Sequence, residues 1–386
     1  MAKTQTASKK AKKKDDYGLP KKLSSRKIAA PVVPYEPRDP KKYKPRIGLI
    51  ACGGITSSHL KAYKAAGYNV VALCDLVKSK ALKRQEEFYP KAEVYTDYRK
   101  VLERDDIAVV DVATHPPDRL KILEDALKAR KHVLSQKPFV LDLAAGQRLV
   151  DLADKRGVKL AVNQNGRWAP HFSYIRNAIA QGVIGEVSAA HLDVSWNHNW
   201  VKGTDFEKVR HLILYDFAIH WFDILTQFMR GQVAKRVFAS FAHSPAQRAH
   251  PETRAVPALL GQALLEYENA QATLTFDADT EYGGRDVTYV TGTKGSIRSE
   301  ADINGKHTVT VYTAKGFGSP KLKGSWFPDG FHGTMGELLC AIEENREPLN
   351  SAQNNLVSLG QCFAAIASAE TGMPQVPGKV KRPPGV

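Results

Sequence analysis

The feature that most constrains this chain is a strand–turn–helix–strand unit over residues 46–75. A short apolar run leads into the glycine pair Gly53-Gly54, a helical pattern follows, and a second apolar run ends in Asp75. Glycines let a backbone approach a pyrophosphate, and the N-terminus of the following helix offers unpaired N–H groups and a positive dipole end. The order of these pieces predicts a dinucleotide-binding turn.

The glycine pattern of this turn is incomplete. Where a dinucleotide fingerprint has three glycines, the chain has Ala51, Gly53 and Thr56, so an ordinary βα turn of another α/β protein is the alternative. Asp75 stands 22 positions after Gly53, where a carboxylate accepts bonds from the adenosine ribose hydroxyls. This acid favours NAD, because it repels a 2′-phosphate, while the nearby Lys78 keeps NADP open as the cofactor.

Strands and helices alternate from residue 46 to 164, which predicts a parallel, doubly wound sheet with ligands at the carboxyl ends of its strands. Polar residues follow several of the predicted strands. The expected cofactor-binding residues are Cys52, Gly53, Gly54, Ile55, Asp75, Thr114, His115, Gln136, Lys137 and Asn165.

A second domain is expected at residues 165–376, because 386 residues are long for one domain. Alternating apolar and polar segments dominate there and predict an antiparallel or mixed sheet with one covered face. The flanks differ in composition. Residues 1–45 hold twelve Lys and two Arg against four acids and form a basic, Pro-rich tail or arm, and residues 377–386 form a flexible tail.

The basic tail carries most of the net charge of +16. The run Lys9–Lys14 could touch nucleic acid, but no aromatic or nucleic-acid-binding motif accompanies it, so a solvated tail is the favoured interpretation. The proline-stiffened segment 30–37 is expected to lie on the body or on a neighbouring subunit. No apolar run is long enough for a membrane helix, and no secretory signal precedes the fold.

Four scattered cysteines, without a C-x-x-C pair, are expected to be reduced thiols of a cytoplasmic protein. They indicate neither a disulfide framework nor a zinc site. No metal is therefore expected at the functional site.

Candidate chemistry begins with the apolar segment 212–229, which predicts a buried helix. Asp216, His220 and Asp223 stand on it at spacings that share one face. His220 is the expected proton carrier near neutral pH, and Asp216 holds its tautomer or bonds the substrate. Asp223 is expected to be structural. The alternative is a hydrogen-bonded structural pair of His220 with Asp216.

Lys137 follows a predicted strand and precedes Pro138, so it is expected to polarise a reacting hydroxyl or carbonyl; a solvated strand-end lysine is the alternative. Two groups of aromatic and amide side chains, around residues 165–168 and 196–200, can stack on sugar faces and bond hydroxyls. Ordinary packing tryptophans are their alternative. The expected substrate-binding residues are Trp168, Trp196, His198, Asp216 and His220.

Together these pieces resemble the Gfo/Idh/MocA family of NAD(P)-dependent oxidoreductases, from about Arg46 to Pro374. The resemblance implies an N-terminal Rossmann domain and a C-terminal α/β domain with a large open, mostly antiparallel sheet, used in homodimers or homotetramers. The markers are Gly48-Leu49-Ile50-Ala51-Cys52-Gly53-Gly54-Ile55 with His59, Val112-Ala113-Thr114, Lys131-His132-Val133, Gln136-Lys137-Pro138, Gly182-Val183-Ile184-Gly185-Glu186-Val187, Asp216-x-x-x-His220-x-x-Asp223, Asn345-Arg346-Glu347-Pro348 and Asn354-Asn355-Leu356.

The resemblance implies a catalytic role for Lys137, Asp216 and His220. Lys137 matches the lysine of the family's E-K-P motif, and the other two residues match its catalytic pair. Departures from the pattern fall nearby. Gln136 replaces the glutamate, Arg119 stands where many members have histidine, and Arg210-His211-Leu212 replaces a glycine-rich run, which would crowd the pocket and add positive charge.

The expected function is hydride transfer between NAD and a hydroxyl of a sugar, polyol or sugar acid. One alternative is a redox-neutral glycoside-cleaving enzyme that oxidises its substrate transiently and eliminates a substituent. Another is a non-enzymatic, NAD-binding regulator, for which the retained Lys137, Asp216 and His220 would have no purpose.

Overall fold

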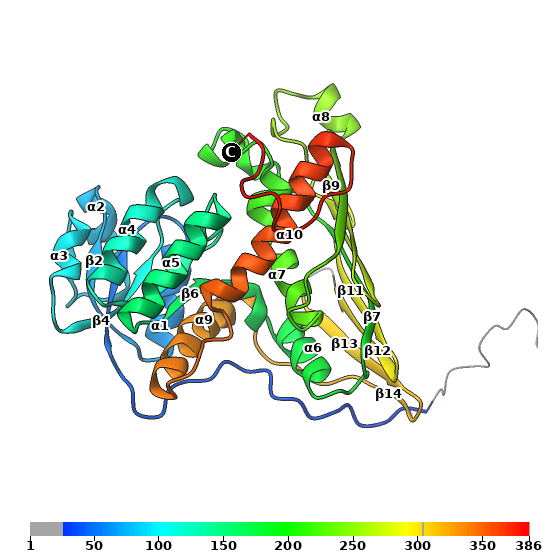
Figure 1. Cartoon of the computed structure of the whole chain (residues 1–386), viewed down its shortest axis with the longest axis horizontal. Coiled ribbons are helices and arrows are strands. Elements are labelled where there is room, and N and C mark those ends of the chain that lie inside the picture. Colours follow the sequence, from blue (N-terminus) through cyan, green and yellow to red (C-terminus); the bar gives the residue numbers. More distant parts are fainter. Residues whose placement is uncertain (1–25, 303–304, 386) are drawn as a thin grey trace, which may run out of the picture.

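The computed structural model describes residues 26–302 and 305–385. The lysine run Lys9–Lys14 and the rest of the first 25 residues lie outside the described residues. Two sheets dominate the molecule, and helices occupy the space between them (Figure 1).

The first sheet has six strands in the order β3-β2-β1-β4-β5-β6, all parallel. Every strand therefore points its carboxyl end to the same edge, which confirms the predicted doubly wound sheet. The strands are β1 (Arg46–Ile50), β2 (Asn69–Cys74), β3 (Glu93–Tyr95), β4 (Ile107–Val112), β5 (His132–Gln136) and β6 (Leu160–Asn163).

Helices connect these strands, and their ends follow local sequence signals. Asp142 caps α5 by accepting a hydrogen bond from the Ala144 N–H, and Gly157 ends the same helix with a left-handed φ of 68°. The helices are α1 (Thr56–Ala65), α2 (Lys78–Phe88), α3 (Tyr98–Leu102), α4 (Pro116–Lys128) and α5 (Leu143–Arg156).

The second sheet has eight strands in the order β14-β13-β12-β11-β7-β10-β9-β8. Only β10 and β7 pair in parallel, so the sheet is mostly antiparallel, as expected. The strands are β7 (Val187–Ser195), β8 (Arg236–Ala242), β9 (Leu260–Glu266), β10 (Gln271–Asp277), β11 (Arg285–Gly292), β12 (Gly295–Ala301), β13 (His307–Thr313) and β14 (Gly316–Gly318).

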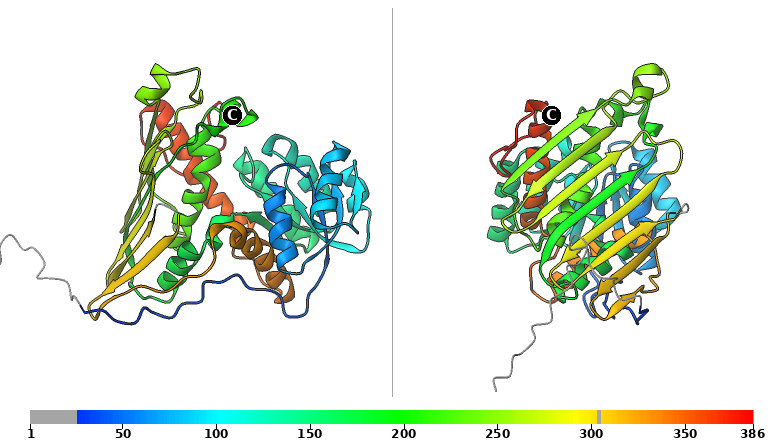
Figure 2. Two further views of the ribbon diagram at one scale, coloured as in Figure 1. Left: turned by 180° about the vertical axis from the view of Figure 1, so that it is seen from behind. Right: turned by 90° about the vertical axis from the view of Figure 1, so that its right-hand side faces the viewer.

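One face of this sheet is covered and the other is open (Figure 2). Phe238, Leu264 and Tyr289 alternate with buried neighbours and lie on the open face, with 46%, 41% and 38% of their surface exposed. Strand pairing sets them in one row across the sheet, through Thr273 and His191. Phe238, Leu264 and Tyr289 form what we call the apolar band of the open face, which Thr273 and His191 interrupt.

The covered face packs against helices that lie between the sheets (Figure 1). The helical segments of this half are η2 (Asn165–Trp168), α6 (Pro170–Ala180), η3 (Asn199–Val201), η4 (Asp205–Lys208), η5 (Ile213–Phe217), α7 (Ile219–Phe228), α8 (Pro245–Ala249), α9 (Trp326–Glu343) and α10 (Ala352–Thr371). No helix in the described ranges is long and apolar enough to cross a membrane.

Helix α9 returns to the first sheet. Its Phe331 and Met335 are fully buried in the same cluster as Ile47 and Leu60, which belong to β1 and α1. The expected domain boundary at residue 164 therefore does not coincide with a boundary in packing. We propose that the nucleotide-binding unit consists of residues 46–164 completed by α9.

The N-terminal arm, residues 26–45, runs along the body from the edge of the second sheet to the first (Figure 1). The Ile28 N–H donates to the Phe317 carbonyl of β14, and the Tyr174 hydroxyl donates to the Pro31 carbonyl at 2.8 Å. At the far end, the Glu343 carboxylate accepts bonds from the main-chain N–H groups of three arm residues, 41–43. The arm contacts both halves of its own chain.

The C-terminal tail is docked rather than loose. The Leu143 N–H donates to the Lys381 carbonyl at 2.9 Å, and Arg382 forms an ion pair with Asp142. Near its end, the Pro384 carbonyl accepts from His211 Nε2 at 2.9 Å. These contacts attach residues 381–384 to both bodies of the chain, whereas residues 377–386 were expected to form a flexible tail.

Candidate active site

The turn between β1 and α1 is open above its glycines. A Cβ built on Gly53 or Gly54 meets no atom of the described residues within 4 Å. The Asp75 carboxylate orders this turn, because it accepts the Cys52 N–H and the Val77 N–H, each at 2.8 Å. The turn therefore offers free space for a pyrophosphate beside a carboxylate that is already oriented.

Ala51 precedes this turn in a left-handed conformation, with φ 76°. The first glycine of the fingerprint would serve this position, since glycine adopts positive φ without steric cost. The chain thus keeps the backbone conformation of the first fingerprint glycine, although the residue at this position is alanine. Thr56, at the third glycine position, is fully buried and its hydroxyl donates to the Gly53 carbonyl at 2.7 Å.

Two further observations fit a nucleotide at this edge. The Thr114 hydroxyl, after β4, is buried with no hydrogen-bond partner among the described residues, so a ligand hydroxyl or phosphate there would satisfy it. Arg84, on α2, donates to the Gly53 carbonyl at 3.0 Å. Sequence reasoning missed Arg84, because nothing in the spacing of α2 marks it as part of the turn.

A fully buried arginine joins the loops that carry Thr114 and Lys137. Arg119 Nε donates to the Thr114 carbonyl at 3.0 Å, and its Nη1 donates to both the Gln136 and the Pro138 carbonyls. Burial lowers the pKa of Arg119 to about 10, so the guanidinium stays charged at neutral pH. Its unusual place in the family pattern thus has a structural purpose, which sequence reasoning did not find.

A buried polar network holds the side chain of Gln136, while Arg119 bonds its main-chain carbonyl. Its Oε1 accepts from Asn163 Nδ2 at 2.9 Å and from the Lys137 N–H at 3.0 Å. Asn163 also contacts His59 Nε2, whose Nδ1 lies 2.7 Å from Asp111. Because Oε1 is occupied by donors, the amide NH₂ of Gln136 is the group left to face a ligand.

Lys137 meets the predicted catalytic helix directly. Its Nζ donates to the main-chain carbonyl of Asp216 at 2.8 Å and lies 3.2 Å from the Asp216 carboxylate. Asp216 belongs to η5, a π-helical segment in which the Ala218 N–H bonds to the Ile213 carbonyl five residues back. Single π-helical turns inserted in helices are frequent at functional sites.

His220 lies one turn further on, in α7. Its Nδ1 is buried and has no hydrogen-bond partner among the described residues, and Asp216 makes no bond to it, so the structural pair considered from sequence does not form. Burial, reinforced by the charge of Lys137, holds the pKa of His220 well below its usual range. The ring is therefore neutral at physiological pH.

His198 is locked in one tautomer by two tryptophans. Its Nδ1 accepts from Trp196 Nε1 at 2.8 Å and from Trp200 Nε1 at 3.2 Å, so the proton of the neutral ring must lie on Nε2. Burial lowers the pKa of His198 to about 4, an effect that Asp216 opposes and Lys137 reinforces. His198 is thus a neutral hydrogen-bond donor beside the Lys137–Asp216 pair.

Trp196 completes this wall of the site. Its ring stacks on Phe217 at a centroid distance of 4.1 Å with an angle of 19° between the planes. Trp326, at the start of α9, lies edge-on to His220 at 5.6 Å and donates from Nε1 to Asn165 Oδ1 at 2.8 Å. Sequence reasoning missed Trp326, which is 161 positions from its amide partner.

Several predicted residues lie elsewhere. Trp168 is buried against Gly333 of α9, with Arg176 over its ring at 5.4 Å, so it is a core contact and its expected role in substrate binding is withdrawn. Arg167 and Asp223 form a buried ion pair at 2.5 Å. This pair occupies the Arg167 guanidinium and agrees with a structural role for Asp223.

A cavity of about 390 Å³ adjoins Asp216 between the two bodies of the chain. Its lining includes His115, Phe206, Arg210 and Gly385. His211 does not enter it, because its ring is buried against the C-terminal tail, and Arg210 is paired with Glu370 at 2.9 Å. His211 therefore does not crowd this cavity, whereas Arg210 lines it with its charge paired to Glu370.

The fold and the site define a class of protein: an oxidoreductase with an NAD-binding Rossmann domain. The family model described as "Oxidoreductase family, NAD-binding Rossmann fold" matches residues 45–164. The family model described as "GFO/IDH/MocA C-terminal domain" matches residues 172–298. The chain belongs to the Gfo/Idh/MocA family, as the resemblance in its sequence predicted.

Known relatives cover most of the chain. It is 26% identical over 347 residues to a D-apiose dehydrogenase of Paraburkholderia graminis, spanning 84% of this chain and 87% of that protein. An oxidoreductase from Agrobacterium radiobacter, solved with NAD⁺, L-tartaric acid and magnesium, superimposes with a TM-score of 0.76 at 20% identity, covering 87% of this chain and 99% of that one.

A third relative is a scyllo-inositol dehydrogenase from Lactobacillus casei, solved with NAD(H) and scyllo-inositol. It superimposes with a TM-score of 0.71 at 22% identity, covering 86% of this chain and 99% of that one. These likenesses extend the fold assignment from the first sheet to the second.

Proposed function

We propose that this protein transfers a hydride between NAD and a hydroxyl group of a sugar or polyol. The observation that carries the proposal is the meeting of Lys137, Asp216, His220 and His198 at the edge where the nucleotide turn lies. NAD, when bound, supplies the hydride acceptor at its nicotinamide ring. Relatives that act on D-apiose and on inositols support the substrate class.

The side chains divide the work at the substrate oxygen. His220 Nε2 accepts the hydroxyl proton, and its depressed pKa keeps this nitrogen free well below neutral pH. Lys137 Nζ donates to the same oxygen and stabilises the negative charge that develops on it. Asp216 holds Lys137 in place through its carboxylate and its main-chain carbonyl.

His198 and Gln136 bind the substrate and the cofactor through hydrogen bonds. The Nε2–H of His198 donates to a second substrate oxygen, since the two indoles exclude the other tautomer. The free amide NH₂ of Gln136 donates to the cofactor or the substrate, where the family's glutamate would accept instead. Thr114, Gly53, Gly54 and Asp75 would hold the nucleotide.

The substrate class follows from the charges near the cavity. Its two basic residues are already matched, Lys208 by Asp205 at 2.7 Å and Arg210 by Glu370 at 2.9 Å. A carboxylate substrate would have to compete with these acids. A neutral sugar or polyol is therefore favoured over a sugar acid.

The test is a panel of neutral sugars, inositols and matching sugar acids, with NAD and NADP supplied separately and NADH absorbance as the readout. Lys137→Met and His220→Ala should each lower kcat by roughly 10²- to 10⁴-fold while NAD still binds. His250→Ala, at an exposed site, is the control. Full activity in either site variant would contradict the assigned roles.

The same experiment separates the redox-neutral alternative. The purified protein is denatured and its supernatant is examined for NAD(H) and NADP(H) by mass spectrometry. Steady NADH release with a free sugar indicates net oxidation, whereas cleavage of a glycoside without NADH release indicates transient oxidation. Binding of neither nucleotide would overturn the enzymatic proposal.

We also propose a homo-oligomer and a cytoplasmic location. The apolar band of Phe238, Leu264 and Tyr289 on the open sheet supports association of identical chains through that face. The four cysteines are buried free thiols, which supports a reducing compartment.

A further inference from the structure

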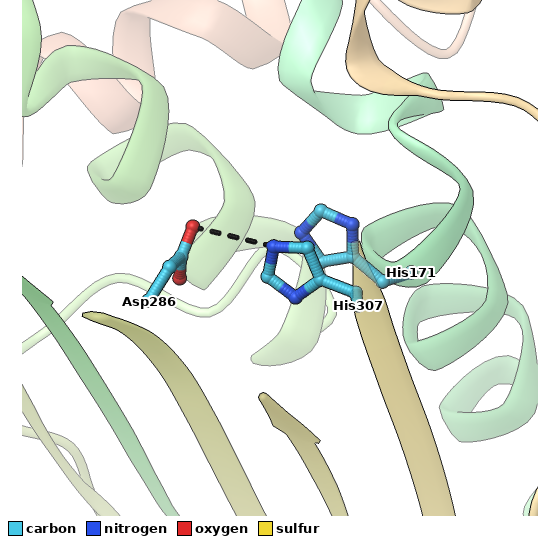
Figure 3. Close-up of side chains that lie close together, drawn as sticks. All are labelled: His171, Asp286 and His307. Atoms are coloured by element: carbon cyan, nitrogen blue, oxygen red, sulfur yellow. Dashed lines mark ion pairs between the residues drawn. The ribbon is translucent and has the colours of Figure 1, made fainter. Parts of the chain in front are cut away.

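A cluster of three potential metal ligands lies apart from the Lys137–Asp216 pair. His171 comes from the first turn of α6, Asp286 from β11 and His307 from β13 (Figure 3). Their ligand atoms all lie within 4.8 Å of one another. The three side chains come from distant parts of the sequence, so no spacing pattern could have shown them.

The protonation of His307 suits metal binding. Its Nδ1 lies 2.9 Å from the Ser299 hydroxyl, and its Nε2 faces Asp286 Oδ2 at 3.6 Å. When the Nδ1–H donates to Ser299, the Nε2 lone pair points towards the carboxylate. Metal-binding histidines usually donate their second ring N–H in this way, which fixes the tautomer.

Two buried polar atoms of the cluster have no partner. His171 is only 4% exposed, and its Nε2 makes no hydrogen bond to any described residue; the same holds for Asp286 Oδ1. Unpaired buried groups of this kind in a native structure call for an unseen ion or water.

We propose that His171, Asp286 and His307 bind one divalent transition-metal ion, for which Zn²⁺ is the natural probe. Two imidazoles and one carboxylate are a ligand set that Zn²⁺ and Fe²⁺ accept, with the remaining position taken by water. Space for that water exists, because the three residues line a cavity of about 360 Å³.

Binding requires a small rearrangement of the two rings. They are stacked at a centroid distance of 3.5 Å with 3° between their planes, so their lone pairs run parallel. Ligands of a tetrahedral zinc lie ~3.4 Å apart and converge on the ion. Rotation of the imidazoles about their Cβ–Cγ bonds, with Asp286 moving closer, brings the three donors to one point.

The ion would join α6 to two strands of the second sheet. Trp326 lines the same cavity, and its ring also contacts His220 at 5.6 Å. A bound metal would therefore brace the wall behind the predicted proton acceptor without contacting the substrate. The expected consequence is greater thermal stability, since a ligand that binds only the folded state stabilises it.

The test uses the full-length chain without a histidine tag, treated with a chelator and then titrated calorimetrically with ZnCl₂. One equivalent should bind, and Co²⁺ should give the visible absorption of a four-coordinate site. His171→Ala and Asp286→Asn should each abolish both signals. Ser299→Ala, which removes only the partner of Nδ1, should weaken binding by roughly 10- to 100-fold.

The controls keep the result decisive. His243→Ala, in a remote and exposed part of the sheet edge, should bind zinc as the native chain does. Circular dichroism of each metal-free variant establishes that it is folded, and Asp286→Asn preserves the shape of its side chain. Absence of one-to-one binding in the native chain, or equal binding in His171→Ala and Asp286→Asn, would overturn the proposal.

Discussion

Ala51 holds a backbone conformation that costs an L-residue about 1–2 kcal/mol. Glycine removes that strain but adds about 0.5–1 kcal/mol of chain entropy to the unfolded state. We expect Ala51→Gly to leave the free energy of unfolding unchanged or to raise it by up to about 1 kcal/mol. Urea denaturation would measure this difference.

The matched control is Ala65→Gly, at an exposed position of α1 with ordinary helical geometry. That change should lower the free energy of unfolding by about 0.5–1 kcal/mol. If Ala51→Gly destabilises the chain as much as Ala65→Gly does, the strain at residue 51 is not real.

His198 makes stability depend on pH. Its pKa in the folded chain is about 4, below the ordinary value near 6.5, so the unfolded state binds the proton more readily. Above the pKa of the imidazole in the unfolded chain, the contribution of His198 to the free energy of unfolding is complete. This contribution is lost as the pH falls from about 6.5 towards 4. At pH 5 the loss is about 2 kcal/mol relative to pH 8.

Replacing His198 with Gln should therefore flatten the acid side of the stability profile, measured as melting temperature between pH 8 and pH 5. His250→Gln, at an exposed imidazole, should leave the profile as in the native chain. An unchanged acid limb in His198→Gln would show that the ring is not held neutral by its surroundings.

Among the elements, the loops after β4 and β5 depend on Arg119. Its loss leaves three carbonyls without their donor, the part-buried one of Thr114 and the buried ones of Gln136 and Pro138. Each such group costs about 1–3 kcal/mol. We expect Arg119→Met to lower the free energy of unfolding by about 3 kcal/mol or more, and to raise the KM for NAD because both loops face the nucleotide.

Arg148→Met, on the exposed side of α5, is the control and should change stability by less than about 0.5 kcal/mol. Calorimetric NAD titration and thermal melting would supply the two readouts. Native NAD affinity in a folded Arg119→Met protein would contradict the proposed positioning of these loops.

Most elements of the first sheet could be predicted because their periodicity is strong, as in the apolar run before Asp111. Other elements lacked such a signal. Strand β12 has a weak pattern, because its buried face consists of Ile297 and the small polar Ser299. The π-helical turn at 213–217 was missed, since an added residue in a helix leaves no mark in composition.

In the candidate site, too, some residues could be predicted from local sequence motifs and others could not. Lys137, Asp216 and His220 could be expected from local motifs, and the structure brings them together. Trp168 was misjudged, because an indole near amides looks the same in sequence whether it faces a ligand or Gly333. Trp326 could not be assigned, since only tertiary folding places it near His220.

For the whole molecule, the open sheet face predicts how chains associate. Phe238 pairs across strands with Leu264, so a charge at either position lies inside the apolar band. Leu264→Glu should shift the assembly to smaller species in sedimentation experiments while the melting curve of the subunit persists. Gln353→Glu, at an exposed polar position of α10 away from this face, is the control. An unchanged assembly in Leu264→Glu would exclude this face.

The arm described above has a kinetic consequence. It is bonded to β14 at one end and to Glu343 of α9 at the other, so the two bodies cannot swing apart until one of these attachments is released. If nucleotide exchange requires the two bodies to separate, release of the arm sets the rate of exchange, and a bound cofactor stays through many catalytic cycles.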